Sequence, residues 1–332
     1  MYVLGIESTC DETAASVVRD GELILSQVVS SQIDLHNIYG GVVPELACRR
    51  HMEVIIPVID KAMGDAKMAI EQIDLIAVSY GPGLVGPLLV GVNAAKGLAI
   101  AENKPIVGVN HVEAHLYAAL MGLKEKPEFP LLGMVVSGGH TVIVKVNALG
   151  SYERIGTTVD DAAGEAFDKV AKLLGLPYPG GPQVEALARN GDPKRFPLKG
   201  GRCKNNPYNF SFSGLKTAVM HAVQGAETID QQFKCDLSAS FQRAVLEDLL
   251  EKVLKAKEAT GCSTLLLGGG VTNNQALRAF FPERAPEIRP IFPTRELSLD
   301  NASMIAGLGY HVFKERGPSS IIDLQVSTRI PF

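Results

Sequence analysis

Two histidines, His111 and His115, lie four positions apart in the segment GVNHVEAHLY at residues 108–117. In a helix, residues four apart have Cβ atoms about 5 to 6 Å from each other, so both imidazoles can bind one metal ion at about 2.0 to 2.1 Å. The alternative is that they are polar residues beside the apolar stripe of an ordinary helix. The pair alone leaves both interpretations open, because a metal site needs a third ligand.

The residues around the pair predict that it lies on a helix. Asn110 is a favourable N-cap, and Glu113 follows three positions later, as in a capping box. Zinc peptidases with two histidines at this spacing carry a glutamate directly after the first one, where this chain has Val112. Peptidase chemistry is therefore disfavoured.

Two further turns carry side chains or backbone groups that suit catalysis or ligand binding. Asp11 and Glu12 follow the first expected strand, where they can hold a cation or accept a proton, or only solvate the turn. The segment SGGHT at residues 137–141 offers backbone N–H groups, a hydroxyl and an imidazole. A plain hairpin turn would need its glycines equally.

Two glycine-rich segments each join an expected strand to an expected helix. GGGVTNN at residues 268–274 suits a phosphate or a ribose, or is only a close turn. GPGLVG at residues 81–86 matches the dinucleotide pattern GxGxxG. After the next strand, however, the ribose-binding acid is replaced by Asn110, so NAD binding is disfavoured.

A cluster of cations forms a candidate contact for nucleic acid, with a solvated loop as the alternative. It comprises Lys194, Arg195, Lys199, Arg202 and Lys204.

The composition indicates a globular protein that folds around a substantial core. The chain has 332 residues, of which 46% are hydrophobic and 20% charged, and its net charge of −4 offers no general attraction for nucleic acid or an anionic membrane. Five cysteines without a CxxC pair favour a reducing cytoplasm. Residues 75–95 lack charge, but Pro82, Pro87 and four glycines predict a strand, a loop and a core helix rather than a membrane span.

The same order of elements occurs twice along the chain, which predicts an α/β fold of two duplicated lobes. VLGIES and LLGMVVS each begin an expected hairpin, and each is followed later by a strand, a glycine loop and a helix. This plan is similar to that of actin-like and sugar-kinase-like ATPases. We expect lobes at residues 1–125 and 126–332, with a helical and basic-loop insertion at about 155–223.

Eight motifs, taken together and in order, cover nearly the whole chain: GIESTCDET, NHVEAH, VSGGHT, GEAFDKVAKLLG, YPGGP, FSFSGLKT, GGGVTNNQALR and LDNASMIA. As a set they closely resemble the tRNA threonylcarbamoyladenosine transferase family, once labelled O-sialoglycoprotein endopeptidases. The resemblance implies the two-lobed fold of the actin, sugar kinase and Hsp70 ATPases, with a nucleotide cleft between the lobes.

The resemblance also implies which residues bind what. The metal ligands would be His111, His115 and Asp300, holding one divalent ion, with iron expected and zinc as the alternative. The donor would be threonylcarbamoyl-AMP, and ATP or ADP with Mg²⁺ is a further candidate ligand. The residues that would bind this substrate or nucleotide are Val135, Val136, Ser137, Gly138, Gly139, Asp168, Gly181, Glu185 and Asn274.

The implied reaction transfers the threonylcarbamoyl group to the N6 amine of adenosine 37 in tRNAs that read codons beginning with adenine. Asp11 or Glu12 is a hypothetical acid or base. The resemblance also implies tRNA, a smaller paralogous subunit and an ATPase accessory protein as partners. The small-residue helix at residues 88–101 could form a dimer face, either with a second copy or with the paralogue.

Two other functions remain open from the residues alone. A phosphoryl-transferring kinase of the same fold would need a strong Mg²⁺-binding acid in the cleft and would phosphorylate a small acceptor. A nucleotide-gated scaffold would bind nucleotide but no metal.

Overall fold

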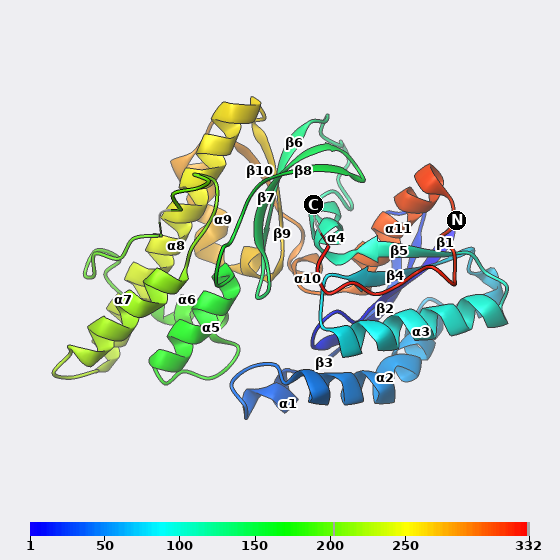
Figure 1. Ribbon diagram of the computed structural model, residues 1–332, viewed down its shortest axis with the longest axis horizontal. Coiled ribbons are helices and arrows are strands. Elements are labelled where there is room, and N and C mark those ends of the chain that lie inside the picture. Colours follow the sequence, from blue (N-terminus) through cyan, green and yellow to red (C-terminus); the bar gives the residue numbers. More distant parts are fainter. Residues whose placement is uncertain (202, 331–332) are drawn as a thin grey trace. The chain divides into compact units, whose positions relative to one another are not determined.

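The computed structural model describes residues 1–201 and 203–330, and the chain forms two compact units. Unit 1 comprises residues 1–126 and 293–332, and unit 2 comprises residues 127–292. Each unit contains a five-stranded mixed sheet with helices packed on it, as Figure 1 shows. The α/β class expected from the alternating strand and helix patterns is confirmed.

The elements of unit 1 are the strands β1 (Tyr2–Glu7), β2 (Glu12–Arg19), β3 (Leu23–Ser31), β4 (Leu75–Gly81) and β5 (Ile106–Asn110), and the helices α1 (Ile33–Asn37), α2 (Pro44–Asp65), η1 (Ile70–Gln72), α3 (Val85–Ala101), α4 (His111–Ala118), α10 (Arg295–Ser298) and α11 (Ala302–Arg316). The elements of unit 2 are the strands β6 (Leu131–Val136), β7 (Thr141–Ala148), β8 (Ser151–Thr157), β9 (Thr264–Gly268) and β10 (Arg289–Ile291), and the helices α5 (Ala163–Leu173), α6 (Gly180–Ala188), α7 (Ser213–Gln224), α8 (Gln231–Thr260), η2 (Gly270–Asn273) and α9 (Gln275–Arg284).

The two sheets have the same topology, which confirms the duplication seen in the sequence. Their strand orders are β3-β2-β1-β4-β5 and β8-β7-β6-β9-β10. In each sheet the first three strands run antiparallel as consecutive hairpins, and the last two lie parallel to the first. The loops that follow β1 and β4 therefore lie at the same edge of their sheet, as do those after β6 and β9.

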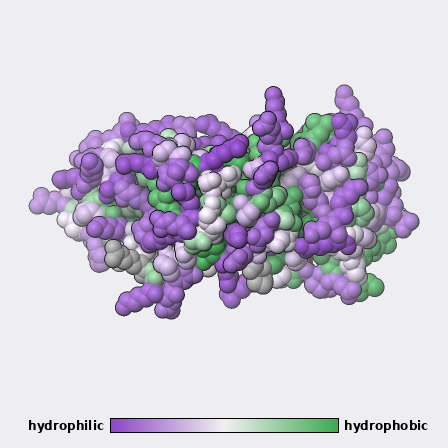
Figure 2. Space-filling view, turned by 90° about the horizontal axis from the view of Figure 1, so that it is seen from above, coloured by the Kyte–Doolittle hydropathy of each residue, from purple (hydrophilic) through white to green (hydrophobic). Residues whose placement is uncertain are grey.

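Helices cover both faces of the sheet in unit 1. Helices α2 and α3 pack on one face, and α4 and α11 pack on the other (Figure 1). Apart from Glu7 and Ser79, the buried side chains of β1 and β4 are aliphatic on both faces, as expected for strands in the middle of a sheet. Figure 2 shows hydrophilic residues covering most of the visible surface, with hydrophobic ones in smaller patches.

The C-terminal segment belongs to unit 1, whereas the sequence alone assigned residues 126–332 to one lobe. The reason is close packing of α11 on the first sheet. A Cβ atom at Gly5 would lie 2.3 Å from the carbonyl oxygen of Ala302, and one at Gly309 would lie 2.4 Å from the Cβ of Ala77. Glycines in both elements thus allow the helix to lie directly on the strands.

The region expected as an insertion contains α5, α6, α7 and the loop between α6 and α7. The helical part of that expected insertion is observed as α5, α6 and α7. All five cysteines are free thiols. Among the described helices, none combines the length and the apolarity that crossing a bilayer requires.

Candidate functional site

Helix α4 begins directly after β5 and presents both histidines of the NHVEAH segment. The side-chain oxygen of Asn110 caps the helix by accepting hydrogen bonds from the backbone N–H groups of Val112 at 2.9 Å and Glu113 at 3.4 Å. Because the helix starts at His111, His115 lies one turn further on, and the two ring centroids are 4.7 Å apart. The predicted helix and the predicted pairing of the imidazoles are both observed.

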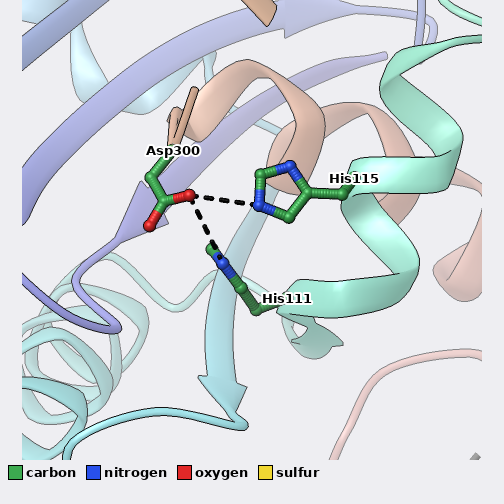
Figure 3. Close-up of side chains that lie close together, drawn as sticks. All are labelled: His111, His115 and Asp300. Atoms are coloured by element: carbon green, nitrogen blue, oxygen red, sulfur yellow. Dashed lines mark hydrogen bonds and ion pairs between the residues drawn. The ribbon is translucent and has the colours of Figure 1, made fainter. Parts of the chain in front are cut away.

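Asp300 supplies the third group, and it comes from the loop just before α11. Its Oδ1 lies 3.1 Å from Nε2 of His115 and 3.5 Å from Nε2 of His111, as Figure 3 shows. The three candidate ligand atoms lie within 4.8 Å of one another. Two ligands of one ion at about 2.0 to 2.2 Å are separated by roughly 3 to 3.6 Å when the angle between them is between square and tetrahedral. The donor types, and the two distances from Asp300 to the histidines, therefore fit a divalent metal ion.

Glu7, at the end of β1, orients one of these histidines. Its side chain is fully buried, and its Oε2 accepts a hydrogen bond from Nδ1–H of His111 at 2.9 Å. Its Oε1 accepts from the backbone N–H of Thr9 at 2.6 Å. Because Glu7 holds one proton at Nδ1, loss of the other proton would leave the Nε2 lone pair of His111 free for a metal ion, which is the arrangement that supports a metal-bound histidine.

None of the sequence motifs identifies Glu7 as a site residue, although the sequence contains one indication that its side chain is buried. It ends a strand whose other residues are apolar or glycine, and a carboxylate there must be buried and therefore partnered. That signal indicates a buried partner without saying which residue it is.

Replacing Glu7 with glutamine should weaken metal binding by roughly 10- to 100-fold, because such supporting residues set ligand orientation and basicity. The amide is similar in size but no longer holds the proton at Nδ1 through a negative charge. Metal affinity measured by competition with a chelator checks this. A Glu12→Gln variant, which removes a nearby carboxylate that does not touch His111, is the control. Equal affinities for wild type and Glu7→Gln would contradict the assignment.

The two histidines differ in their electrostatic surroundings when no metal is bound. Burial acts to lower the pKa of His111, but the negative charges of Glu7 and Asp300 outweigh it and raise that pKa to about 9. Burial dominates for His115, whose pKa is lowered despite the hydrogen bond with Asp300. Nδ1 of His115 is buried and has no hydrogen-bond partner among residues 1–201 and 203–330.

Asp11 lies in the turn between β1 and β2, and Glu12 is the first residue of β2, in the same unit as the histidines. Burial raises the pKa of Glu12 well above its usual range, with further contributions from the charges of Asp11 and Asp300. The influence of Asp300 connects this turn electrostatically with the metal ligands. A carboxyl group with a raised pKa suits proton transfer near neutral pH.

His51 of α2 forms hydrogen bonds with two residues beside this turn. Its Nε2–H donates to the carbonyl oxygen of Cys10 at 3.0 Å, and the hydroxyl of Thr13 donates to its Nδ1 at 2.7 Å. Its side chain is fully buried, and burial lowers its pKa despite the bond to Cys10. His51 is therefore neutral in the folded protein at pH 7.

The lowered pKa of His51 predicts a loss of stability in mild acid. In the unfolded chain this histidine takes up a proton near its ordinary pKa of about 6.5. Below that pH the unfolded state binds more protons than the folded state, so the free energy of unfolding falls as pH decreases towards the folded pKa. Urea denaturation at several pH values between about 7.5 and 5.5 should show a shallower decline for His51→Gln than for wild type. Parallel curves would contradict this origin.

The candidate substrate residues all lie in unit 2. The first of them, residues 135–139, form the end of β6 and the turn between β6 and β7. The backbone N–H of Ser137 donates to the carbonyl oxygen of His140 at 2.7 Å, which closes the turn. The start of α5 packs on it, because the N–H of Gly164 donates to the carbonyl oxygen of Ser137 at 3.1 Å. A Cβ at Gly164 would lie 2.7 Å from that same oxygen.

The other members of the set connect to this turn through a chain of contacts. Oδ1 of Asp168, on α5, accepts from the N–H of Gly180 at the start of α6 at 2.7 Å. One turn along α6, Oε1 of Glu185 accepts from the N–H of Gln275, the residue after Asn274, at 3.0 Å. The glycine loop after β9 lies against the end of β6, since a Cβ at Gly269 would lie 2.5 Å from the carbonyl oxygen of Val136.

We call residues 135–139, Asp168, Gly181, Glu185 and Asn274 the ligand cradle. Three of its glycines, Gly138, Gly139 and Gly181, would meet no protein atom within 4 Å if they carried a Cβ, and none has a positive φ. Neither packing nor turn geometry therefore explains why these positions lack side chains. The open space leaves room for a ligand to approach the backbone closely at these positions.

The glycines of GPGLVG differ in this respect. A Cβ at Gly81 would lie 2.0 Å from the carbonyl oxygen of Ser327, one at Gly83 would lie 2.5 Å from that of Thr9, and one at Gly86 would lie 2.9 Å from Sγ of Cys48. Packing within unit 1 thus accounts for this motif without a dinucleotide.

Comparison with solved structures defines the class of fold. Component A of the (R)-2-hydroxyglutaryl-CoA dehydratase of Acidaminococcus fermentans matches with a TM-score of 0.53 at 14% identity, over 94% of this chain and 98% of that one. Full-length HypF in its phosphate- and nucleotide-bound form matches with a TM-score of 0.65 at 15% identity, over 96% of this chain and 47% of that one. The chain has the two-lobed fold of the actin-like ATPases.

Sequence comparison identifies the family within that fold. The family model described as tRNA N6-adenosine threonylcarbamoyltransferase matches residues 23–307. Proteins of that name from Protochlamydia amoebophila and Symbiobacterium thermophilum are 56% and 53% identical, over 100% and 94% of this chain and 98% and 92% of theirs. The chain belongs to the tRNA N6-adenosine threonylcarbamoyltransferase family, and it is a transferase.

Proposed function

We propose that this chain transfers a threonylcarbamoyl group from threonylcarbamoyl-AMP to the N6 amine of adenosine 37 in tRNA, with a divalent metal ion bound in unit 1. Membership of the transferase family supports the reaction. The single observation that supports the metal is the convergence of two imidazoles and one carboxylate within 4.8 Å.

The metal ligands would be His111, His115 and Asp300, with Glu7 orienting the first of them. Two imidazoles and a carboxylate leave coordination positions open for substrate oxygens, which is typical of catalytic rather than structural sites. The chemistry that such an ion supplies is Lewis acidity, which polarises a carbonyl group. Iron is the expected ion, and zinc suits the same ligands.

The ligand cradle of unit 2 would bind the adenylate. Backbone N–H groups beside Gly138 and Gly139 suit phosphate oxygens, because no side chain blocks their approach. The carboxylates of Asp168 and Glu185 suit ribose hydroxyl groups, which donate hydrogen bonds. ATP or ADP with Mg²⁺ would bind the same cradle in place of the adenylate.

In the reaction, the N6 nitrogen of adenosine attacks the carbonyl carbon of the threonylcarbamoyl group. A C–N bond forms, the bond from that carbon to the phosphate oxygen breaks, and AMP leaves with the bonding electron pair. The attacking amine loses one proton, which Glu12 or Asp11 would accept. An aromatic amine is a weak nucleophile, so correct positioning should contribute most of the rate enhancement.

The most direct test is mass analysis of tRNA nucleosides after incubation of unmodified tRNA with threonylcarbamoyl-AMP. The modified adenosine should form with this protein and its partner proteins present, and not when this protein is left out. The double variant Asp11→Asn, Glu12→Gln should slow the reaction at saturating substrate without loss of metal. Undiminished modification by that variant would exclude both carboxyl groups from proton transfer.

An apolar helical surface supports a protein partner. Val85 and Leu89 of α3 and Met52 and Ile56 of α2 are 44–60% exposed, and the two helices pack together. We infer that this face binds the smaller paralogous subunit. Leu89→Glu should abolish a complex detected by light scattering, whereas Ile322→Glu, at an exposed apolar residue elsewhere, should not. A homodimer of this chain that Leu89→Glu disrupts would indicate a second copy instead. An ATPase accessory protein is a further expected partner.

A further inference from the structure

One segment of unit 2 is strongly basic, although the chain as a whole is acidic. Residues 193–226 contain six lysines and arginines and no aspartate or glutamate, whereas the whole chain has 36 acidic and 32 basic residues. A run of this length without a carboxylate creates a local positive field that the net charge of −4 conceals. The candidate metal ligands and the ligand cradle include no residue of this segment.

The basic residues lie mainly on the loop between α6 and α7, which runs along α8 (Figure 1). The N–H of Phe196 donates to Oγ of Ser240 on α8 at 3.2 Å. Further along, a Cβ at Gly200 would lie 2.3 Å from Oδ1 of Asp248, which also belongs to α8. The backbone of the loop is therefore anchored at two points, and its side chains are presented from a defined surface.

The basic side chains of this loop that the structure describes are exposed to solvent and have no acidic partner, and Arg202 lies outside the described residues. Four of them are exposed and form no ion pair with any residue in the described parts of the chain: Lys194, Arg195, Lys199 and Lys204. Neighbouring cations on the helices behave differently, since Arg189 pairs with Glu185 and Lys252 pairs with Asp248. We call these four residues the basic quartet. Unneutralised cations on a fixed backbone are suited to bind the phosphates of a polyanion.

A hollow of about 410 Å³ adjoins the quartet and has a different chemistry. Arg195 and Phe196 line one part of it, and Phe233 of α8 lines another, with the two aromatic rings 5.4 Å apart. The carboxylates of Glu227, Asp230 and Asp236 also line it, so a phosphate would be repelled there. Aromatic faces, a guanidinium and hydrogen-bond acceptors together suit an unstacked nucleobase.

We propose that this surface binds tRNA, with the basic quartet on the phosphate backbone and the hollow receiving one unpaired base. That the RNA is tRNA rests on the proposed function. RNA is favoured over a lipid surface because a membrane offers phosphates but no base for an aromatic hollow, and because residues of the hollow and the quartet share one loop.

The test compares two quadruple glutamine variants that lose the same charge. One replaces the basic quartet. The other replaces Lys67, Lys124, Lys172 and Arg289, which are also exposed, form no ion pair in the described chain, and are spread over both units. Binding of unmodified tRNA to the full-length protein is measured by fluorescence anisotropy at several salt concentrations, without threonylcarbamoyl-AMP.

The quartet variant should bind tRNA at least about 30-fold more weakly at low salt, and its plot of log affinity against log salt should be shallower by about 3, since each phosphate contact contributes about 0.7 to 0.9 to the slope. The control variant should keep the wild-type slope. Equal losses in both variants, or no measurable tRNA binding by the wild type, would overturn the proposal. Wild-type binding to vesicles containing phosphatidylserine, with no preference for tRNA, would point to a membrane instead.

A single variant tests the hollow separately. Phe196→Leu keeps an apolar side chain against the core but removes the aromatic face, so affinity should fall about 5- to 50-fold with an unchanged salt slope. Unchanged affinity of Phe196→Leu for tRNA would show that the hollow does not bind an unpaired base. These experiments measure tRNA binding alone, so they can support the tRNA surface even if no modified adenosine is formed. Conversely, the proposed reaction can be observed even if the two quadruple variants bind tRNA equally.

Discussion

Replacing Asp300 with asparagine is expected to remove the bound metal and to reduce tRNA modification by at least about 100-fold. Oδ1 of Asp300 faces Nε2 of both histidines, and it brings the only negative charge among the three proposed ligands. Asparagine has nearly the same shape, but its neutral amide is a poor ligand for a divalent ion. Without the ion, the carbonyl group loses the polarisation on which the proposed reaction depends.

Metal content measured by mass spectrometry of the purified protein checks this prediction, together with nucleoside analysis. Wild type should contain about one ion per chain, and Asp300→Asn and His115→Ala should contain almost none. His221→Ala changes an exposed histidine on α7 and should keep both the ion and the activity. Because His115 is buried, circular dichroism must show that its variant is folded. Full metal content in a folded Asp300→Asn would refute the proposed ligand set.

The same measurements separate the transferase from a nucleotide-gated scaffold. A scaffold would bind nucleotide in unit 2 and carry no ion in unit 1. The outcome that favours it is an absence of stoichiometric metal in wild type together with unimpaired nucleotide binding. ATP-dependent phosphorylation of a small acceptor would instead favour a kinase of the same fold.

Replacing Gly181 with valine is expected to weaken nucleotide binding by at least about 100-fold without a loss of stability. No protein atom lies within 4 Å of the position that a Cβ would take, and the backbone has no positive φ, so the folded protein tolerates a side chain there. A nucleotide bound against the backbone would collide with it. The expected loss is large because a rigid, β-branched side chain at the start of α6 cannot turn away freely.

Isothermal titration with AMP or ADP, together with thermal denaturation, measures both parts of this prediction. Gly64→Val is the matched control, because Gly64 also has open space around it but lies in α2 of unit 1. Both variants should unfold within a few degrees of wild type, and only Gly181→Val should lose affinity. If Gly181→Val binds nucleotide with wild-type affinity, the open space beside these glycines is not a nucleotide site, and the nucleotide binds elsewhere.

The local features of the site followed from the sequence alone. The spacing of His111 and His115, with Asn110 before them, predicted a helix that carries both imidazoles on one turn, and α4 has that form. The repeated order of strands, glycine loops and helices predicted two similar α/β lobes, and the two sheets have the same topology. These features depend on residues within one helical turn or one hairpin, so the signal is local.

The contacts that complete the candidate metal site depend on packing between segments that are distant in the sequence. Asp300 reaches His115 across 185 positions because α11 lies on the first sheet, an approach that depends on Gly5 and Gly309 having no side chain. Glu7 reaches His111 across 104 positions because Glu7 ends β1 and His111 begins α4 directly after β5, a parallel strand of the same sheet. No spacing rule predicts such contacts, since they follow from which faces pack together.

The glycine motifs show the same division between what is local and what is tertiary. As sequences, GPGLVG and SGGHT both offer glycines that could admit a ligand, although the residue after the next strand disfavours NAD binding at the first. In the folded chain, other parts of unit 1 fill the space beside the first, whereas the space beside Gly138 and Gly139 stays open. A sequence determines where the backbone lacks a Cβ, but only the tertiary structure decides whether protein atoms or a ligand can occupy the room that remains.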